Sequence, residues 1–157
     1  MGEVEQVPEI AKIPEVQECP ELQQLLELIN APHRSIESAG CEKWSDTVEA
    51  GEAKARVGCY VDILYSDWQA NEHPENLLLL ASRLVSPVEE CGKWWGQVNL
   101  SLCRLKHLPG TTSPWGLELH VNNFGRTEEE ARKLWAETIG RLGNTIAQLP
   151  KDLKWIS

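Results

Sequence analysis

The clearest pattern in the chain is the strict alternation of inward and outward positions from Lys54 to Tyr65. A period of two indicates a strand with one buried face. The positions predicted to face the core are Ala55, Val57, Cys59, Val61, Ile63 and Tyr65, and those predicted to face away are Lys54, Arg56, Gly58 and Asp62. A second strand is predicted from about Trp94 to Lys106 and a third from Trp115 to Asn122. The loop 107–114 is rich in Pro, Gly, Thr and Ser, so it should join these two strands as an antiparallel hairpin.

Three other segments have the period of a helix. The first is predicted from Pro20 to about Asn30, and the second follows Pro74 and ends before Pro87. In the third, Thr127 and Glu130 have the spacing of a capping box, and the apolar positions continue to Pro150. The predicted buried stripes are Leu22, Leu25, Leu26 and Ile29; Leu77, Leu78, Ala81, Leu84 and Val85; and Ala131, Leu134, Trp135, Thr138, Ile139, Leu142, Ile146 and Leu149.

Two glycines stand inside the last predicted helix, at Gly140 and Gly143. Each weakens a helix by about 1 kcal/mol relative to alanine. Their presence therefore indicates close approach to another backbone.

These elements predict an α+β fold with two layers, an antiparallel sheet with helices on one face. Two topologies are open. If Leu153–Ile156 pairs into the sheet, residues 54–157 form a ferredoxin-like βαββαβ unit. If residues 34–53 supply strands instead, the element order approaches that of the small acidic chaperones of type III secretion. That comparison rests on element order and acidity, and no motif accompanies it.

The first part of the chain is repetitive: residues 7–30 divide into four hexads of the form apolar–Pro–Glu–apolar–x–x, and the last hexad lacks the proline. Prolines at this spacing prevent a continuous helix. We therefore predict an extended acidic arm over residues 1–19 and one α+β domain over residues 20–157. The arm is either a solvated tail or a segment that docks on the domain or on a partner through Val7, Ile10, Ile13 and Val16.

The net charge is concentrated in the first third of the chain. Residues 1–53 contain twelve acidic and three basic side chains, whereas residues 54–157 contain twelve of each. A net charge of −9 favours a partner with a basic surface and argues against direct binding of nucleic acid. The sequence has no apolar run of membrane-spanning length and no signal-peptide pattern at its N-terminus, so a soluble, cytoplasmic protein is expected.

The predicted hairpin places several reactive side chains on one face of the sheet. Glu118 should lie near Cys103, and His120 near Ser101. A serine, a histidine and a glutamate invite comparison with a catalytic triad, but an open sheet lacks oxyanion donors and a shaped pocket. The favoured interpretation is a solvated face, with these four residues as an alternative ligand-binding face. The five cysteines have no zinc-site spacing, so neither a metal nor a cofactor is predicted.

Seven tryptophans are an unusual number for a chain with ten aromatic residues. Large aromatic side chains on a polar surface are typical anchors for a partner protein. The candidate anchors are Trp44, Trp68, Trp95 and Trp115, with Trp44, Trp68 and Trp115 at the ends of predicted elements. The alternative is that each tryptophan closes the rim of a thin core.

Three classes of function are compatible with this sequence. The favoured one is a non-enzymatic protein that binds another protein with a basic surface, as inhibitors, immunity proteins, antidefence proteins and assembly chaperones do. The second is a small-molecule-binding domain or small enzyme that uses the polar sheet face. The third is a structural subunit that forms homo-oligomers through its arm.

Overall fold

The computed structural model describes residues 10, 19–32, 34–89, 96–105 and 114–156, with only the backbone over 85–89. Its four strands are β1 (Ile36–Ala50), β2 (Ala53–Tyr65), β3 (Gly96–Arg104) and β4 (Trp115–Gly125). Its helices are α2 (Pro20–Ile29), α3 (Pro74–Glu89) and α4 (Glu128–Gln148), with a short 3₁₀ helix η2 (Trp68–Glu72) before α3. The strands form one antiparallel sheet in the order β1-β2-β4-β3.

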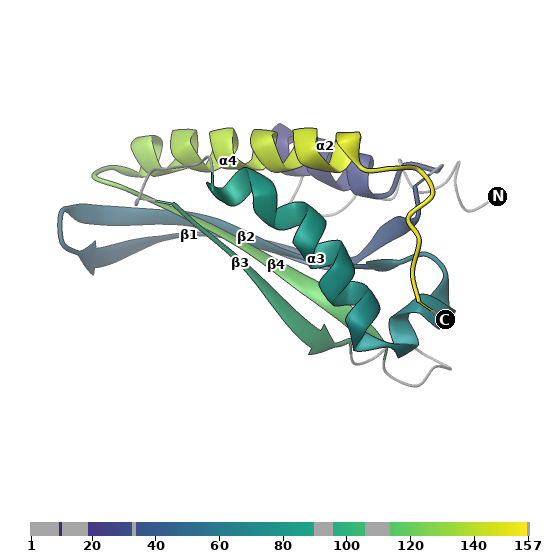
Figure 1. Ribbon diagram of the computed structural model, residues 1–157. Coiled ribbons are helices and arrows are strands. Elements are labelled where there is room, and N and C mark those ends of the chain that lie inside the picture. Colours follow the sequence, from purple (N-terminus) through teal and green to yellow (C-terminus); the bar gives the residue numbers. More distant parts are fainter. Residues whose placement is uncertain (1–9, 11–18, 33, 90–95, 106–113, 157) are drawn as a thin grey trace.

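The helices α2, α3 and α4 all lie on the same side of the sheet, and no helix of the described residues covers its other face (Figure 1). The core between the two layers contains the predicted inward positions of β2, each of which is at most 8% exposed. The predicted two-layer α+β fold is therefore confirmed.

Residues 36–50 supply the edge strand β1, as one of the two predicted alternatives required, so the ferredoxin-like alternative is wrong. The likeness in element order to the secretion chaperones stays a prediction. Leu153–Ile156 forms no strand. The backbone of this terminal segment is held instead by side chains: Leu153 N donates to Ser35 Oγ, and Ile156 N donates to Asn76 Oδ1. The partners of this segment are the side chains of Ser35 and Asn76, not a neighbouring strand. The apolar pattern of the segment alone could not show this difference.

The helix α3 differs from the prediction in two respects. It continues through Pro87 to Glu89, because a proline in the last turn removes only one backbone donor and little helix follows it. Leu78 is 54% exposed rather than buried, since the inward positions of this helix are Leu77, Leu80 and Leu84. Together with Leu79, it leaves an apolar surface on α3.

The helix α4 begins as predicted: the Thr127 hydroxyl accepts a hydrogen bond from Glu130 N at 3.1 Å. Of its two glycines, Gly143 is buried, and a Cβ there would lie 3.2 Å from Leu28 Cδ1 of α2. The close neighbour is thus a side chain, not the predicted backbone. Gly140 has no such neighbour and lines a groove of about 390 Å³ between α2 and α4.

One described residue belongs to the predicted arm. Ile10 is helical, 6% exposed, and packs into the core cluster. Val7, Ile13 and Val16 lie outside the described residues, and so does the candidate anchor Trp95. None of the described helices has the length and apolar character needed to span a membrane.

Candidate functional site

Polar and aromatic side chains occupy the centre of the uncovered sheet face, because inward and outward positions alternate along β2 and β4. Across these strands Asp62 lies opposite Glu118, Tyr60 opposite His120, and Gly58 opposite Asn122. On the other side of β4, Ser101 of β3 lies opposite Glu118 and Asn99 opposite His120. These rows form the candidate site.

The register between β3 and β4 differs by two residues from the prediction, which placed Cys103 beside Glu118 and Ser101 beside His120. The hairpin closes at Leu105, whose N–H donates to Pro114 O, so both ends of its connection lie one residue earlier than predicted. A shift of two residues keeps every side chain on its face. The predicted face is therefore right although the predicted partners are wrong.

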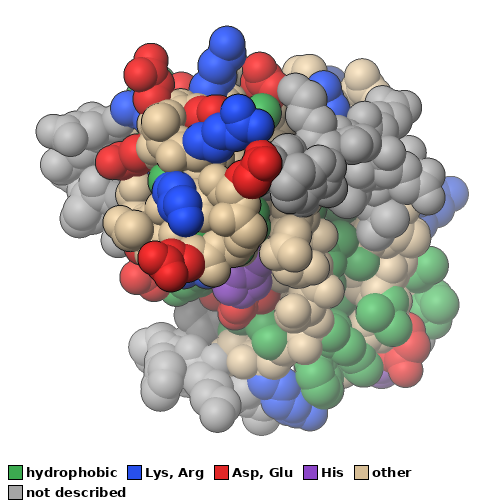
Figure 2. Space-filling model, turned by 90° about the vertical axis from the view of Figure 1, so that its left-hand side faces the viewer, with side chains coloured by type: hydrophobic (Ala, Val, Ile, Leu, Met, Phe, Trp, Pro, Cys, Tyr) green, Lys and Arg blue, Asp and Glu red, His purple; other side chains and the backbone are tan. Residues whose placement is uncertain are grey.

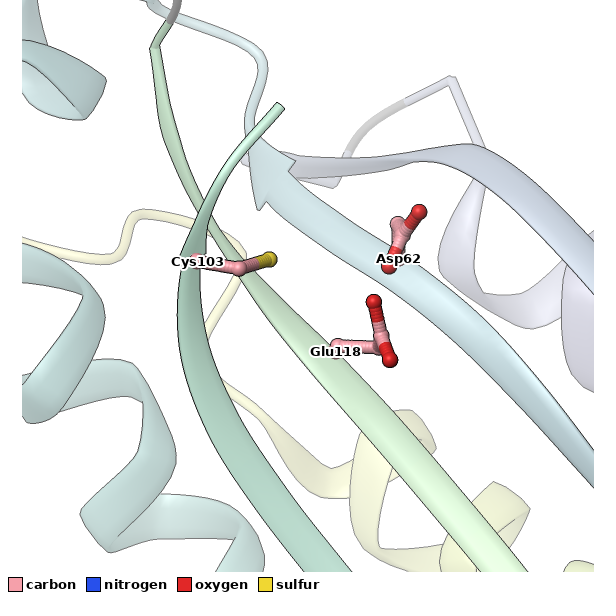
Figure 3. A group of neighbouring side chains, drawn as sticks. All are labelled: Asp62, Cys103 and Glu118. Carbon is pink, nitrogen blue, oxygen red and sulfur yellow. The ribbon is translucent and has the colours of Figure 1, made fainter. Parts of the chain in front are cut away.

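Three side chains from three strands approach one another on this face: Asp62 of β2, Glu118 of β4 and Cys103 of β3 (Figure 3). One ligand atom of each lies within 4.8 Å of the others. The Oδ1 atom of Asp62 is buried and has no hydrogen-bond partner among the described residues. The neighbouring Glu118 carboxylate instead pairs with His120 Nε2.

This environment changes the titration of two groups. Burial raises the pKa of Asp62 to about 6, and the adjacent Glu118 carboxylate adds to this rise while His120 opposes it. Burial also raises the pKa of the Cys103 thiol to about 11, with further contributions from Asp62 and Glu118. The Cys103 thiol keeps its proton at neutral pH and donates to Gly116 O at 3.6 Å. Negative charge is therefore concentrated on the two carboxyl groups.

Aromatic rings lie beside the carboxyl groups. The centroids of Tyr60 and His120 are 5.7 Å apart, and the Trp44 ring lies 6.4 Å from Tyr60 and 6.1 Å from His120. The Trp44 Nε1–H donates to Asn122 Oδ1 at 3.1 Å. A Cβ on Gly58 would stand 2.6 Å from Trp44 Nε1 and 2.2 Å from Asn122 Oδ1, so only glycine leaves room for the indole across the strand.

The remaining candidate anchors are spread over the molecule. Trp44 lies within β1 rather than at the end of an element, and it is half-buried on the open face. Trp115 packs against the core with the Arg104 guanidinium over its ring, as expected for a residue that closes a rim. Trp68 is 39% exposed on η2. Figure 2 shows charged side chains of both signs mixed over one part of the surface and hydrophobic side chains gathered on another.

The arrangement does not form a catalytic triad. Ser101 lies opposite Glu118, whereas Asn99 lies opposite His120, so the serine is not the neighbour of the histidine across the strands. A divalent metal is chemically compatible with the donors of Asp62, Glu118 and Cys103, since thiolate and carboxylate ligands both bind zinc. It would have to displace the thiol proton.

Replacement of Asp62 by asparagine is expected to stabilise the protein at neutral pH. The folded state binds the Asp62 proton more tightly than the unfolded chain, because the pKa is about 6 instead of 3.8. The wild-type protein therefore loses stability as pH rises through this interval, whereas the Asp62→Asn variant does not. After allowance for solvent screening, we expect a gain of about 1–2 kcal/mol in the free energy of unfolding above pH 6 and almost none below pH 4. Urea denaturation at several pH values measures this difference.

Asp46 provides the contrasting variant. The Arg56 guanidinium donates to its carboxylate and lowers its pKa, so Asp46→Asn should reduce stability at neutral pH rather than increase it. An unchanged or lower stability of Asp62→Asn at pH 7 would mean that Asp62 is well compensated in the folded protein.

Comparison with known proteins gives no relative: the chain matches no family model, no curated protein and no solved structure.

Proposed function

We propose that this protein is a non-enzymatic cytoplasmic protein that binds a partner with a basic surface, and that the open face of the sheet contacts this partner. The observation that carries the proposal is the juxtaposition of aromatic and acidic side chains at the centre of this face. Trp44, Tyr60 and His120 lie together, and Asp62 and Glu118 occupy the next positions on the same strands.

Each part of this surface has a role in association. Half-buried aromatic side chains supply contact area with little loss of conformational freedom, and they dominate the energetics of many interfaces. Carboxylates and a net charge of −9 attract a basic surface and accelerate encounter. Inhibitor, immunity, antidefence and chaperone roles all depend on binding another protein.

A small-molecule- or metal-binding domain is the second candidate. It is favoured by the approach of Asp62, Cys103 and Glu118 donors within 4.8 Å. None of the described helices covers the open face (Figure 1), and small-molecule sites are usually concave, so a protein surface is the better occupant.

Affinity capture from cells of origin tests the proposal, with wild-type protein, Trp44→Ala and Leu79→Ala as baits. Leu79 is a control of similar apolar character, 43% exposed on α3, away from the open face. We expect wild type and Leu79→Ala to retain the same basic protein, and Trp44→Ala to weaken its measured affinity by about 30-fold, the effect of losing an interface hot spot. Added salt should weaken the complex, because it screens exposed charges.

Two results would contradict the proposal. Equal affinity of Trp44→Ala and wild type for the captured partner would exclude the open face as the contact surface. An affinity unaffected by salt would show that electrostatic attraction does not contribute to the complex.

A further inference from the structure

We infer that the chain forms a homodimer in which the outer edge of β3 pairs antiparallel with the same edge of a second copy. This pairing is independent of the basic partner proposed above. Three features support it: the composition of the two edge strands, the self-complementary pattern of β3, and the position of the acidic part of the chain.

β3 is an edge strand without the features that usually protect an edge. The edge of a sheet carries backbone groups that can pair with another chain, and charged side chains or bulges normally prevent this. β3 pairs with β4 in an unbroken register over nine residues, and Arg104 at its end is its only charged residue. Its other side pairs with none of the described strands.

The opposite edge strand, β1, has both kinds of protection. Two register shifts interrupt its pairing with β2. Five charged residues are distributed along it: Glu37, Glu42, Lys43, Asp46 and Glu49. The difference between the two strands indicates that the edge of β1 stays in solvent, whereas the edge of β3 is suited to pairing.

The helix-facing side chains of β3 are also incompletely covered. Their neighbours on β4 are at most 1% exposed: Leu117, Leu119 and Val121. The residues directly opposite these on β3 pack against the core but are only partly buried: Leu102, Leu100 and Val98. The edge of β3 therefore presents apolar surface together with its backbone donors and acceptors, and a paired strand would cover both.

The residue pattern of β3 is complementary to itself. An antiparallel pair centred on Leu100 uses all nine residues of the strand and places Leu100 opposite its counterpart in the second copy. Val98 then faces the partner's Leu102 on the helix side, and Asn99 faces the partner's Ser101 on the open side. Because opposed residues share a face, the open faces of the two copies lie on the same side of one continuous sheet.

The distribution of charge favours a second copy as the occupant of this edge. The acidic excess lies in residues 1–53, whereas residues 54–157 contain equal numbers of acidic and basic side chains. The described elements of the acidic region, α2 and β1, contact each other, and β1 lies at the edge of the sheet opposite β3. Pairing through β3 therefore joins the neutral regions of two copies and keeps their acidic elements apart. A basic partner would gain no comparable attraction from this edge.

The test is sedimentation velocity of the purified full chain at physiological salt, from micromolar to near-millimolar concentration. We expect a dimer that dissociates on dilution. Asn99→Lys/Ser101→Lys changes two exposed positions and places like charges directly opposite each other across the proposed interface. It should raise the dissociation constant of the dimer by at least about 10-fold.

Asn99→Glu/Ser101→Lys is the matched control. It introduces charges at the same two positions, but each introduced lysine faces an introduced glutamate of the other copy. It should dimerise at least as tightly as the wild type. Circular dichroism confirms that both variants are folded.

Cysteine cross-linking tests the register. Leu100→Cys should form a disulfide between the two copies on mild oxidation, because directly opposed residues of antiparallel strands lie within disulfide reach. Val98→Cys should not link to itself, since its neighbour in this register is the partner's Leu102. Mass spectrometry of the digested dimer identifies which cysteines are joined.

The outcomes separate the homodimer from the proposed function. A wild-type chain that stays monomeric at every concentration would overturn the homodimer and leave the basic partner standing. Dimerisation of Asn99→Lys/Ser101→Lys at the wild-type level would place any self-association elsewhere and would also overturn it. If Leu100→Cys cross-links to a different protein during affinity capture and not to its own copy, the edge belongs to that protein and the homodimer is refuted.

Discussion

Replacement of Trp135 by alanine is expected to lower the free energy of unfolding by about 3–5 kcal/mol, the usual loss for a large core aromatic residue. Trp135 is the largest fully buried side chain among the described residues. It lies in the middle of α4, on the face that packs against the sheet. Its removal leaves a cavity between the two layers that the rigid sheet cannot close. Urea denaturation followed by circular dichroism measures the loss.

Two variants establish that this loss comes from the cavity. Trp135→Phe keeps most of the volume and should cost roughly 1–2 kcal/mol, in line with partial truncations in cores. Lys133→Ala changes an exposed position of the same helix and should stay within about 0.5 kcal/mol of wild type. If Trp135→Ala were as stable as Lys133→Ala, the packing of α4 on the sheet would be refuted.

Replacement of Asn76 by alanine has the second largest expected effect on stability, a loss of about 2–3 kcal/mol. Asn76 is fully buried, and its Nδ2 donates to Ala70 O at 3.0 Å and to Ile156 O at 2.8 Å. Its Oδ1 accepts a hydrogen bond from Ile156 N at 2.8 Å. Alanine leaves the buried Ala70 carbonyl without this donor and releases the terminal segment. Thermal and urea unfolding measure the change in stability.

Limited proteolysis gives this variant a second, local measurement. Trypsin should cut after Lys154 faster in Asn76→Ala, because the segment that contains Lys154 is no longer held at Ile156. Asn144→Ala, at an exposed position of α4, should leave both stability and cleavage unchanged. Cleavage of Asn76→Ala at the wild-type rate would mean that other contacts hold the terminus.

The elements that could be predicted from the sequence are those buried along one face. β2 and α4 contact the core over their whole length, so their periods of two and 3.6 residues are visible in the residue types. β1 is an edge strand whose one fully buried residue is Ile36, and such a strand leaves little apolar alternation. Its pairing with β2 therefore could not be inferred from pattern.

The candidate site could be predicted only in part, because the alternation along a strand gives the face of each residue but not its neighbour on the next strand. Parity along a strand correctly assigned Glu118, His120 and Cys103 to one face, and Asp62 to the outward face of β2. It could not show that Asp62 and Glu118 are neighbours, since this follows from the strand order β1-β2-β4-β3. The contact of Trp44 with Gly58 depends on the β1–β2 register and was likewise not accessible.

The strand order also has a consequence for how the chain folds. The sheet consists of two hairpins, β1–β2 and β3–β4, each formed by strands adjacent in sequence, and the two hairpins meet along β2 and β4. Contacts within each hairpin close short loops, whereas pairing of β2 with β4 must close a loop containing η2, α3 and β3. We therefore expect the docking of the hairpins to limit the folding rate. Because Asp62 and Glu118 meet across that junction, the candidate site comes into being only at this last step.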